Sequence, residues 1–423
     1  MDRPVPADPA TQRVALVLEA GGARSAYQVG ALEVLLPRLA EAGAQPRLVV
    51  GTSAGALLAA ACAATAHLDA EEQTARLLGV LGQATKRGVM RPLWRHSPSV
   101  ALRYASETLG ISRFRLRGLV GTQPLHRTLR TALDWDAVHR NIEDGRLDAV
   151  AITATAVRTG RVVLFTEAAP GFGDLPRPPR EHHRHYAPTR LGVEHLMASS
   201  AIPALFPSVR VEEPASAAGW YVDGATRRRV PLAPGLELGG ERLVVVGTGS
   251  LHPAPADTER DREDVDIGDG GATLLGAVMD DPLRHDLRRL AEVNDLAADE
   301  AVLRALDRRR HEEGRPGHRA VPYVAVAPER GEELAALAME VFRANHGSWL
   351  HTLGDPDLQL VHRLLGSDSP LQGELLSYLM FDPDFFDGAA DLGRRDARQW
   401  LRREPQLWRT GPMPAPEEAG PAS

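Results

Sequence analysis

Cysteine, lysine and aromatic residues are scarce in this chain of 423 residues. Cys62 is the only cysteine, which excludes an intrachain disulfide and a zinc cluster built on cysteines. No run of about 18 apolar residues occurs, so we expect no membrane-spanning helix. The first apolar run, residues 14–18, is too short for the core of a signal peptide. These absences predict a cytoplasmic protein without a signal peptide or a transmembrane helix.

The remaining composition is typical of a globular protein, because 43% of the residues are hydrophobic and 25% are charged. A chain of this length can bury a large core without covalent staples. The formal net charge is −7, which excludes a globally basic nucleic-acid binder. We therefore expect no nucleic-acid partner.

One stretch departs from this acidic balance. Residues 86–130 contain ten basic residues, Lys86 among them, and a single acid, Glu107. Most charge runs are solvated surface, and that alternative stays open. Because Leu93 and Trp94 interrupt the charges, we favour peripheral contact between this stretch and an anionic membrane, at the inner membrane surface.

Hydrophobic periodicity predicts an α/β fold. Short apolar runs at 14–18 and 48–50 are typical of buried strands, and residues at helical spacing follow each of them. Strand, helix, strand, helix in this order predicts a parallel sheet that is covered by helices on both faces. Further strands are expected at 149–156, 161–165, 243–246 and 321–327, and a loop is expected at 168–190.

The domain organisation follows from the same patterns. We predict a three-layer α/β/α domain with a mostly parallel central sheet over residues 12–327. After Pro328, leucines at helical spacing predict a helical C-terminal extension over 328–405. Residues 406–423, which are rich in Pro, Gly and Glu, are predicted to form a flexible tail.

The segment Gly51-Thr52-Ser53-Ala54-Gly55 is a G-x-S-x-G motif. It follows an apolar strand and precedes an alanine-rich helix, which is the context of a nucleophile elbow. A serine exposed on so sharp a turn needs small neighbours, because the turn brings the strand and helix backbones together. Ser53 is therefore a candidate nucleophile; the alternative is that it only caps the helix.

A second glycine-rich turn, Gly21-Gly22-Ala23-Arg24, follows the first strand. Consecutive glycines let backbone N–H groups converge on one point, which can hold a phosphate or the oxyanion of a tetrahedral intermediate. The nucleotide interpretation fits poorly, because the spacing departs from G-x-G-x-x-G and no G-K-[ST] follows. A tight packing turn is the remaining alternative.

A third motif is Asp223-Gly224-Ala225, at the end of an apolar segment. An Asp-Gly pair after a strand is usually a turn. A carboxylate becomes a competent base toward a serine hydroxyl when burial raises its pKa above the ordinary value of about 4. Asp223 is therefore a candidate base.

Together the three motifs resemble the patatin-like phospholipase family, and a fourth block, Ala-Ser-Ser-Ala-Ile-Pro-Ala-Leu-Phe-Pro at 198–207, stands in the family's order. The resemblance implies a lipid acyl hydrolase of phospholipase A or lysophospholipase type, with an acyl-enzyme and no cofactor. Ser53 would attack the ester and Asp223 would take its proton. The turn Gly21–Arg24 would hold the oxyanion, and a lipid would be the substrate.

Two positions depart from the family's usual pattern. The family often has a third glycine and a glycine after the arginine, where this chain has Ala23 and Ser25. Arg24 would either hold the loop or face an anionic head group, and the sequence does not separate these two roles.

Two rival hypotheses remain open. One is an α/β-hydrolase-like esterase with a Ser-Asp-His triad, whose histidine would be His252, His285 or His311. Only about 50 residues precede Ser53, which is few for that fold, and the Asp-Gly-Ala block has no place in it. The other is a catalytically silent lipid-binding or scaffold protein that uses the same fold.

No metal site is predicted. His182, His183 and His185 lie in a Pro-rich segment without paired carboxylates, so we expect an exposed polar loop there. The acidic segment 257–269 lacks the spacing of a calcium-binding loop.

Overall fold

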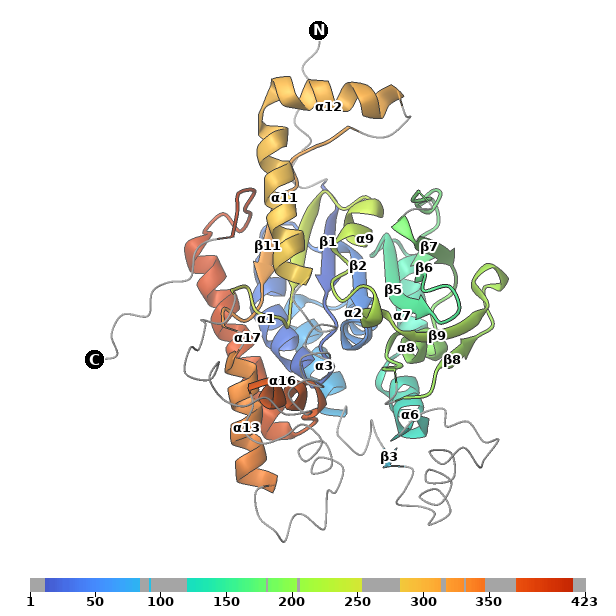
Figure 1. Cartoon of the computed structure of the whole chain (residues 1–423), viewed down its shortest axis with the longest axis vertical. Helices are drawn as coiled ribbons and strands as arrows, with labels where there is room; N and C mark the ends of the chain where they lie inside the picture. Colours follow the sequence, from blue (N-terminus) through green and yellow to red (C-terminus); the bar gives the residue numbers. More distant parts are fainter. Residues whose placement is uncertain are drawn as a thin grey trace, which may run out of the picture.

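The computed structural model describes residues 12–83, 91–92, 120–179, 182–203, 206–252, 282–312, 317–330, 332–346 and 370–413. The strands of its main sheet are β1 (Val14–Leu18), β2 (Pro46–Thr52), β5 (Ala149–Ala156), β6 (Val162–Ala168), β7 (Arg184–Pro188), β8 (Val209–Val211), β9 (Gly219–Asp223), β10 (Arg242–Val246) and β11 (Tyr323–Val326). The strand order is β11-β10-β1-β2-β5-β6-β7, and β9, which also pairs with β8, pairs with β5 (Figure 1). Two short strands, β3 (Arg91–Pro92) and β4 (Val120–Gly121), form a separate pair.

The central part of the sheet is parallel. Leu16 of β1 pairs with Val244 of β10 on one side and with Val49 of β2 on the other. These strands are apolar at successive positions because both faces of a parallel sheet are covered by helices. Strand β6 is antiparallel to β5. The mostly parallel α/β/α fold that the sequence predicts is nevertheless confirmed, because the strands from β11 to β5 are parallel.

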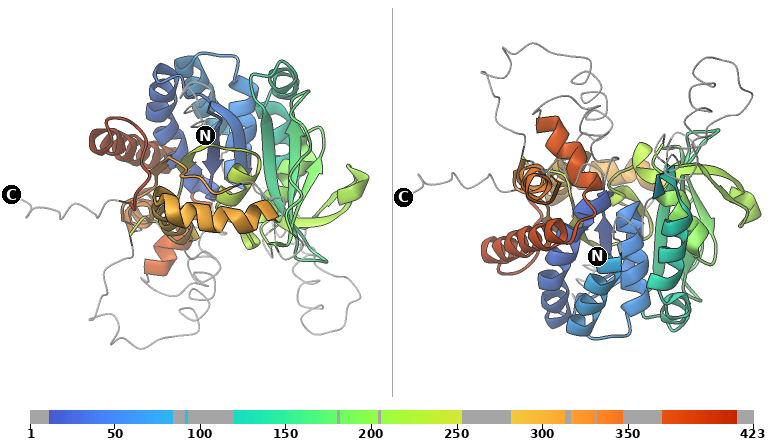
Figure 2. Two further views of the ribbon diagram at one scale, coloured as in Figure 1. Left: turned by 90° about the horizontal axis from the view of Figure 1, so that it is seen from above. Right: turned by 90° about the horizontal axis from the view of Figure 1, so that it is seen from below.

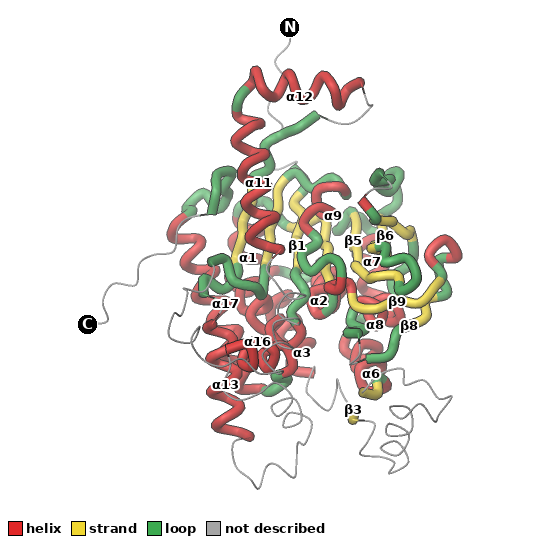
Figure 3. The backbone as a smooth tube through the Cα atoms, viewed as in Figure 1, coloured by secondary structure: helices red, strands yellow, loops and turns green. Residues whose placement is uncertain are grey.

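Helices cover both faces of the sheet (Figure 2). Helix α9 packs against β1 on the face opposite to the one that α1 and α2 cover, and Figure 3 shows the strands gathered between the helical layers. The helices of this part are η2 (Gly22–Arg24), α1 (Ser25–Glu41), α2 (Ala54–Thr65), α3 (Ala70–Gln83), α6 (Gln123–Ala132), α7 (Trp135–Glu143), α8 (Val193–Ser199), η5 (Ala215–Ala217), η6 (Gly224–Thr226) and α9 (Leu232–Glu237).

The rest of the described chain is mainly helical, as predicted for the C-terminal part. Its helices are α11 (Pro282–Ala298), α12 (Glu300–Glu312), α13 (Glu332–His346), α16 (Pro370–Leu379) and α17 (Pro383–Arg403). Helix α17 packs closely against α1, and glycines allow this approach. A side chain on Gly30 would overlap the carbonyl oxygen of Ala390, and a side chain on Gly393 would overlap the carbonyl oxygen of Tyr27. The Tyr27 hydroxyl also donates a hydrogen bond of 2.8 Å to Asp396. The C-terminal helices are therefore packed directly onto the sheet domain.

One sequence-based prediction is wrong. Residues 168–190 do not form a loop throughout, because Arg184–Pro188 is strand β7, parallel to β6. The Pro, Gly and His residues of this segment are typical of a loop, but an edge strand, which pairs on one side only, tolerates them. The acidic segment 257–269 and most of the basic stretch 86–130 lie outside the described residues. Among the helices that the structure describes, none combines the length and apolar character needed to cross a bilayer.

Candidate active site

Ser53 stands on a strained turn between β2 and α2. Its backbone φ is 56° and its ψ is −123°, a conformation that residues other than glycine rarely adopt. The flanking glycines are required by close approach: a side chain on Gly51 would overlap the carbonyl oxygen of Gly55, and a Cβ on Gly55 would lie 2.5 Å from that of Glu19. Ser53 occupies the N-cap position, but its side chain makes no capping hydrogen bond. The hydroxyl is therefore left for another partner.

That partner is Asp223, which is 170 residues away in the sequence. The Ser53 hydroxyl donates a hydrogen bond of 2.7 Å to Oδ2 of Asp223. Asp223 ends β9, which pairs with β5, and its other carboxylate oxygen accepts the backbone N–H of Ala225 at 2.7 Å. The backbone N–H of Asp223 donates to the carbonyl oxygen of Ala201 at 2.8 Å. Backbone and side chain are both fixed with the carboxylate facing the serine.

The environment of Asp223 favours proton uptake. Burial raises the pKa of its carboxyl to about 6, although the hydrogen bonds from Ser53 and from the N–H of Ala225 and the charge of Arg229 lower it. A carboxylate with this pKa is still mostly ionised at neutral pH and is a much stronger base than an exposed aspartate. Ser53 and Asp223 thus form a hydroxyl and base pair in direct contact.

A third side chain, Ser199, holds the backbone of the serine turn. The N–H of Ser53 donates to the hydroxyl oxygen of Ser199 at 2.8 Å, and that hydroxyl donates to the carbonyl oxygen of Thr153 at 2.7 Å. Ser199 ends α8 and belongs to the block 198–207 that the sequence singled out without a role. A fully buried serine beside the Ser53 turn therefore links this block to β5.

The turn Gly21–Arg24 lies beside the serine. Gly22 has a φ of 53°, and Gly22 and Ser53 line one cavity. The Ser25 hydroxyl donates to the carbonyl oxygen of Gly22 at 2.6 Å, so this departure from the family pattern gives the turn an extra hydrogen bond. Ala23 is completely buried. Its methyl group therefore faces the core.

The two roles left open for Arg24 are separated by its contacts. Its side chain is 3% exposed and forms an ion pair with Glu374 of α16. Its Nε donates to the hydroxyl of Ser377 at 2.5 Å, and one terminal nitrogen donates to the carbonyl oxygen of Thr248 at 3.4 Å. Arg24 therefore ties the glycine-rich turn to the C-terminal helices.

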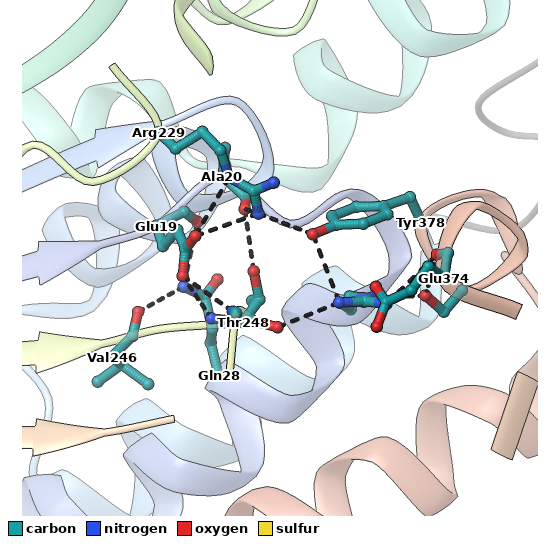
Figure 4. Close-up of polar contacts among 11 residues, drawn as sticks. Glu19, Ala20, Gln28, Arg229, Val246, Thr248, Glu374 and Tyr378 are labelled. Atoms are coloured by element: carbon teal, nitrogen blue, oxygen red, sulfur yellow. Dashed lines mark hydrogen bonds and ion pairs between the residues drawn. The ribbon is translucent and has the colours of Figure 1, made fainter. Parts of the chain in front are cut away.

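A buried ion pair, which the sequence did not indicate, lies next to the start of the same turn. Glu19 follows β1, and its carboxylate lies 3.1 Å from the guanidinium of Arg229 and accepts the N–H of Thr248 at 2.7 Å. Figure 4 shows Arg229 between Glu19 and Tyr378, with Ala20 and Thr248 beside it. In the sequence, Glu19 only ended an apolar run, and Arg229 was one of three consecutive arginines.

The cavity at Ser53 has a volume of about 70 Å³ and mostly apolar walls. Its apolar wall residues include Leu57, Leu58, Val80, Leu125, Leu129 and Phe381. Such walls favour the hydrocarbon part of a ligand over a charged part. Ser53 therefore lines a small space whose walls suit hydrocarbon.

A larger cavity of about 880 Å³ lies at the opposite ends of the strands. Arg13, Arg47 and Asp148 line it, and both arginines pair with the aspartate, at 3.1 and 2.6 Å. In open α/β sheets, ligands bind at the carboxyl ends of the strands, where Ser53 lies. The smaller cavity is therefore the candidate site.

The other predicted groups are placed away from Ser53 or only partly described. Of the basic stretch, α6 is described, and its Leu125 and Leu129 face the Ser53 cavity while Arg127 and Arg130 are exposed. His252 lines a different cavity, beside Trp400. Among the described residues, no cluster of three or more histidine, cysteine, aspartate or glutamate side chains is placed to hold a metal ion.

No curated protein matches the chain. The family model described as patatin-like phospholipase matches residues 16–236, which is just over half of the chain and includes both Ser53 and Asp223. The chain belongs to the patatin-like phospholipase family, a family of lipid acyl hydrolases.

Proposed function

We propose that this protein hydrolyses carboxylic esters of lipids, of phospholipase A or lysophospholipase type, through a dyad of Ser53 and Asp223. The observation that carries the proposal is the hydrogen bond of 2.7 Å from the Ser53 hydroxyl to a buried carboxylate. The raised pKa of Asp223 and the apolar cavity support it. Membership of the patatin-like phospholipase family supports a lipid substrate.

In the first half-reaction, the Ser53 oxygen attacks the ester carbonyl carbon while its proton passes to Asp223. The negative charge that develops on the carbonyl oxygen is held by backbone N–H groups of the turn, from Gly22 and Ala23. One such donor contributes about 10²–10³-fold to turnover. The intermediate then collapses, the bond to the leaving alcohol breaks, and Asp223 returns the proton to that alcohol.

In the second half-reaction, water attacks the acyl-enzyme. Asp223 now accepts a proton from the water, and the same N–H groups hold the second oxyanion. Collapse releases the fatty acid, and the proton returns from Asp223 to the Ser53 oxygen. No cofactor enters either half-reaction.

A triad is not needed to describe this site, because the carboxylate contacts the serine directly. His252 lines a separate cavity with Glu329 and Trp400, and His285 is exposed on α11. The side chain of His311 lies outside the described residues.

A fluorophosphonate probe tests the proposal. We expect the wild-type protein to be labelled at Ser53 and to hydrolyse lipid esters, and Ser53→Ala to lose both properties. Ser200→Ala is the matched control, because Ser200 lines the same cavity without contacting Asp223. A folded wild-type protein that takes up no probe at Ser53 would instead favour a silent lipid-binding protein.

We further propose that the basic stretch 86–130 holds the protein on anionic membranes. The described part supports this, since α6 directs Leu125 and Leu129 into the Ser53 cavity and exposes Arg127 and Arg130. Positive charge thus lies next to the cavity that would receive the acyl chain. Each arginine near an anionic surface contributes about 1 kcal/mol at low ionic strength.

Vesicles with and without phosphatidylglycerol test this contact. Changing both Arg127 and Arg130 to Gln should weaken binding to anionic vesicles by about 30-fold at low salt. Changing both Arg398 and Arg402 to Gln is the control, because these exposed arginines lie one turn apart on α17. Equal effects of the two double variants would remove the idea.

A further inference from the structure

Helix α16 lies outside the family-matched residues, yet it contacts the glycine-rich turn directly. Its residues Glu374 and Ser377 receive the donors of Arg24, whose side chain is almost completely buried. The carbonyl oxygen of Tyr378 lies so close to Gly22 that a side chain there would overlap it. Position 22 therefore requires glycine for two reasons, this close contact and its φ of 53°.

The Tyr378 side chain occupies the centre of this contact. Its ring lies 4.2 Å from the guanidinium carbon of Arg24, and its hydroxyl oxygen accepts a hydrogen bond of 2.7 Å from Arg229 and a longer one, 3.4 Å, from Arg24. Arg24 belongs to the glycine-rich turn, and Arg229 follows the Asp223 segment. One hydroxyl therefore bridges the two segments that carry the oxyanion donors and the base. Figure 4 shows Tyr378 beside Arg229.

We propose that Tyr378 is a positioning residue for the oxyanion turn, so that α16 completes an active site whose other parts lie within residues 16–236. This inference rests on the proposed ester hydrolysis. The turn is a single 3₁₀ turn of three residues that leads into α1, and α16 contacts it from outside the family-matched residues. Displacing catalytic donors by about 1 Å lowers turnover by about 10²-fold. The same segment supplies Phe381 to the wall of the Ser53 cavity.

The test is Tyr378→Phe, which keeps the ring against Arg24 and removes only the hydroxyl. We expect kcat for lipid ester hydrolysis to fall about tenfold with KM within about twofold, since the loss affects the transition state more than substrate binding. The rate of Ser53 labelling by a fluorophosphonate should fall in parallel, because that reaction also places negative charge on an oxygen in the oxyanion turn.

Tyr27→Phe is the matched control. The Tyr27 hydroxyl is also buried and also bonds to the C-terminal helices, but its bond goes to Asp396 of α17 and not to Arg24 or Arg229. Both substitutions remove one buried hydroxyl, so a merely structural role for Tyr378 predicts equal thermal shifts and unchanged kcat in both. A lower kcat in Tyr378→Phe alone supports positioning.

A second pair decides the question should Tyr378→Phe not fold. Glu374→Gln weakens the ion pair with Arg24, and Glu333→Gln weakens a comparable pair with Arg395 on the outside of α17; the two glutamates are 34% and 30% exposed. We expect a fall in kcat of several-fold for Glu374→Gln only. Wild-type protein without Ser53-dependent hydrolysis would refute the proposed function. If the wild-type protein is active and kcat is unchanged in Tyr378→Phe, the role of Tyr378 alone is overturned. If the tyrosine variant does not fold, an unchanged kcat in Glu374→Gln has the same meaning.

Discussion

Two buried carboxylates near the site, Glu19 after β1 and Asp223 at the end of β9, have opposite surroundings. They are 1% and 3% exposed, so burial does not distinguish them. Glu19 faces the guanidinium of Arg229 at 3.1 Å and accepts the N–H groups of Thr248 and Gly249. Asp223 accepts one backbone N–H and the hydroxyl of Ser53.

The difference shows how one site can contain an anchor and a base. A buried carboxylate that faces a cation and accepts several N–H groups fixes the backbone around it. Asp223 instead bonds to a hydroxyl and one backbone N–H, burial raises its pKa to about 6, and it can exchange a proton with its hydroxyl partner. The experiments below test this division of roles.

The largest effect is expected for Asp223→Asn. The amide keeps the shape of the carboxylate but cannot accept the serine proton, so kcat should fall by about 10³-fold in steady-state hydrolysis of a lipid ester. Asp286→Asn is the control, because burial also raises the pKa of Asp286, which lies on α11. Activity of Asp223→Asn within tenfold of the wild type would contradict the assignment of the base.

Glu19→Gln should instead lower stability. The amide removes the negative charge that Glu19 sets against the buried Arg229, and breaking such a buried pair destabilises a protein by about 3–5 kcal/mol. Unfolding by urea measures the loss, and Glu241→Gln, which weakens the partly exposed pair with Arg319, should lose less than about 1 kcal/mol. Equal losses would mean that Glu19 is not the anchor.

The pH dependence of stability separates the two carboxylates further. Asp223 has a higher pKa in the folded protein than in the unfolded chain, so its protonation stabilises the fold below about pH 4, and this contribution is lost as pH rises through about 6. The Asp223→Asn variant has no carboxyl to titrate at this position, so its stability does not change in this way. Its stability relative to the wild type should rise by about 2–3 kcal/mol between pH 4 and pH 8, as urea unfolding at both values would show. A constant difference would mean that Asp223 is not a buried base.

Sequence alone predicted the parts of the site that depend on local geometry. The G-x-S-x-G pattern is local, because a sharp strand-to-helix turn needs small residues at fixed spacing, and the structure has Ser53 on such a turn. The parallel sheet followed from the alternation of strands and helices. Asp223 was a candidate base from its Asp-Gly motif, but its pairing with Ser53 came from the family resemblance, since no local pattern brings together residues that are 170 positions apart.

The supporting residues could not be found in this way. Arg229 stands in a run of three arginines that is typical of an exposed turn, and only the fold places its side chain on Glu19. Tyr378 lies among leucines of an amphipathic helix, where an aromatic residue is usually part of the core. Strand β7 lacks the apolar run of the central strands because it lies at the edge of the sheet.

The smallest effect, and the sharpest comparison, lies in the pH dependence of activity. Hydrolysis needs ionised Asp223, so kcat/KM should rise with pH through about 6 and fall about tenfold from pH 7 to pH 5. Arg229 lowers the pKa of Asp223, but Glu19 neutralises most of that charge. In Glu19→Gln the arginine is no longer neutralised, so the acid limb of the profile should move to lower pH. An unmoved limb would show that the two carboxylates are electrostatically independent. A limb displaced to higher pH would mean that the glutamine variant has withdrawn Arg229 from Asp223, so that Glu19 holds the arginine in place as well as neutralising it.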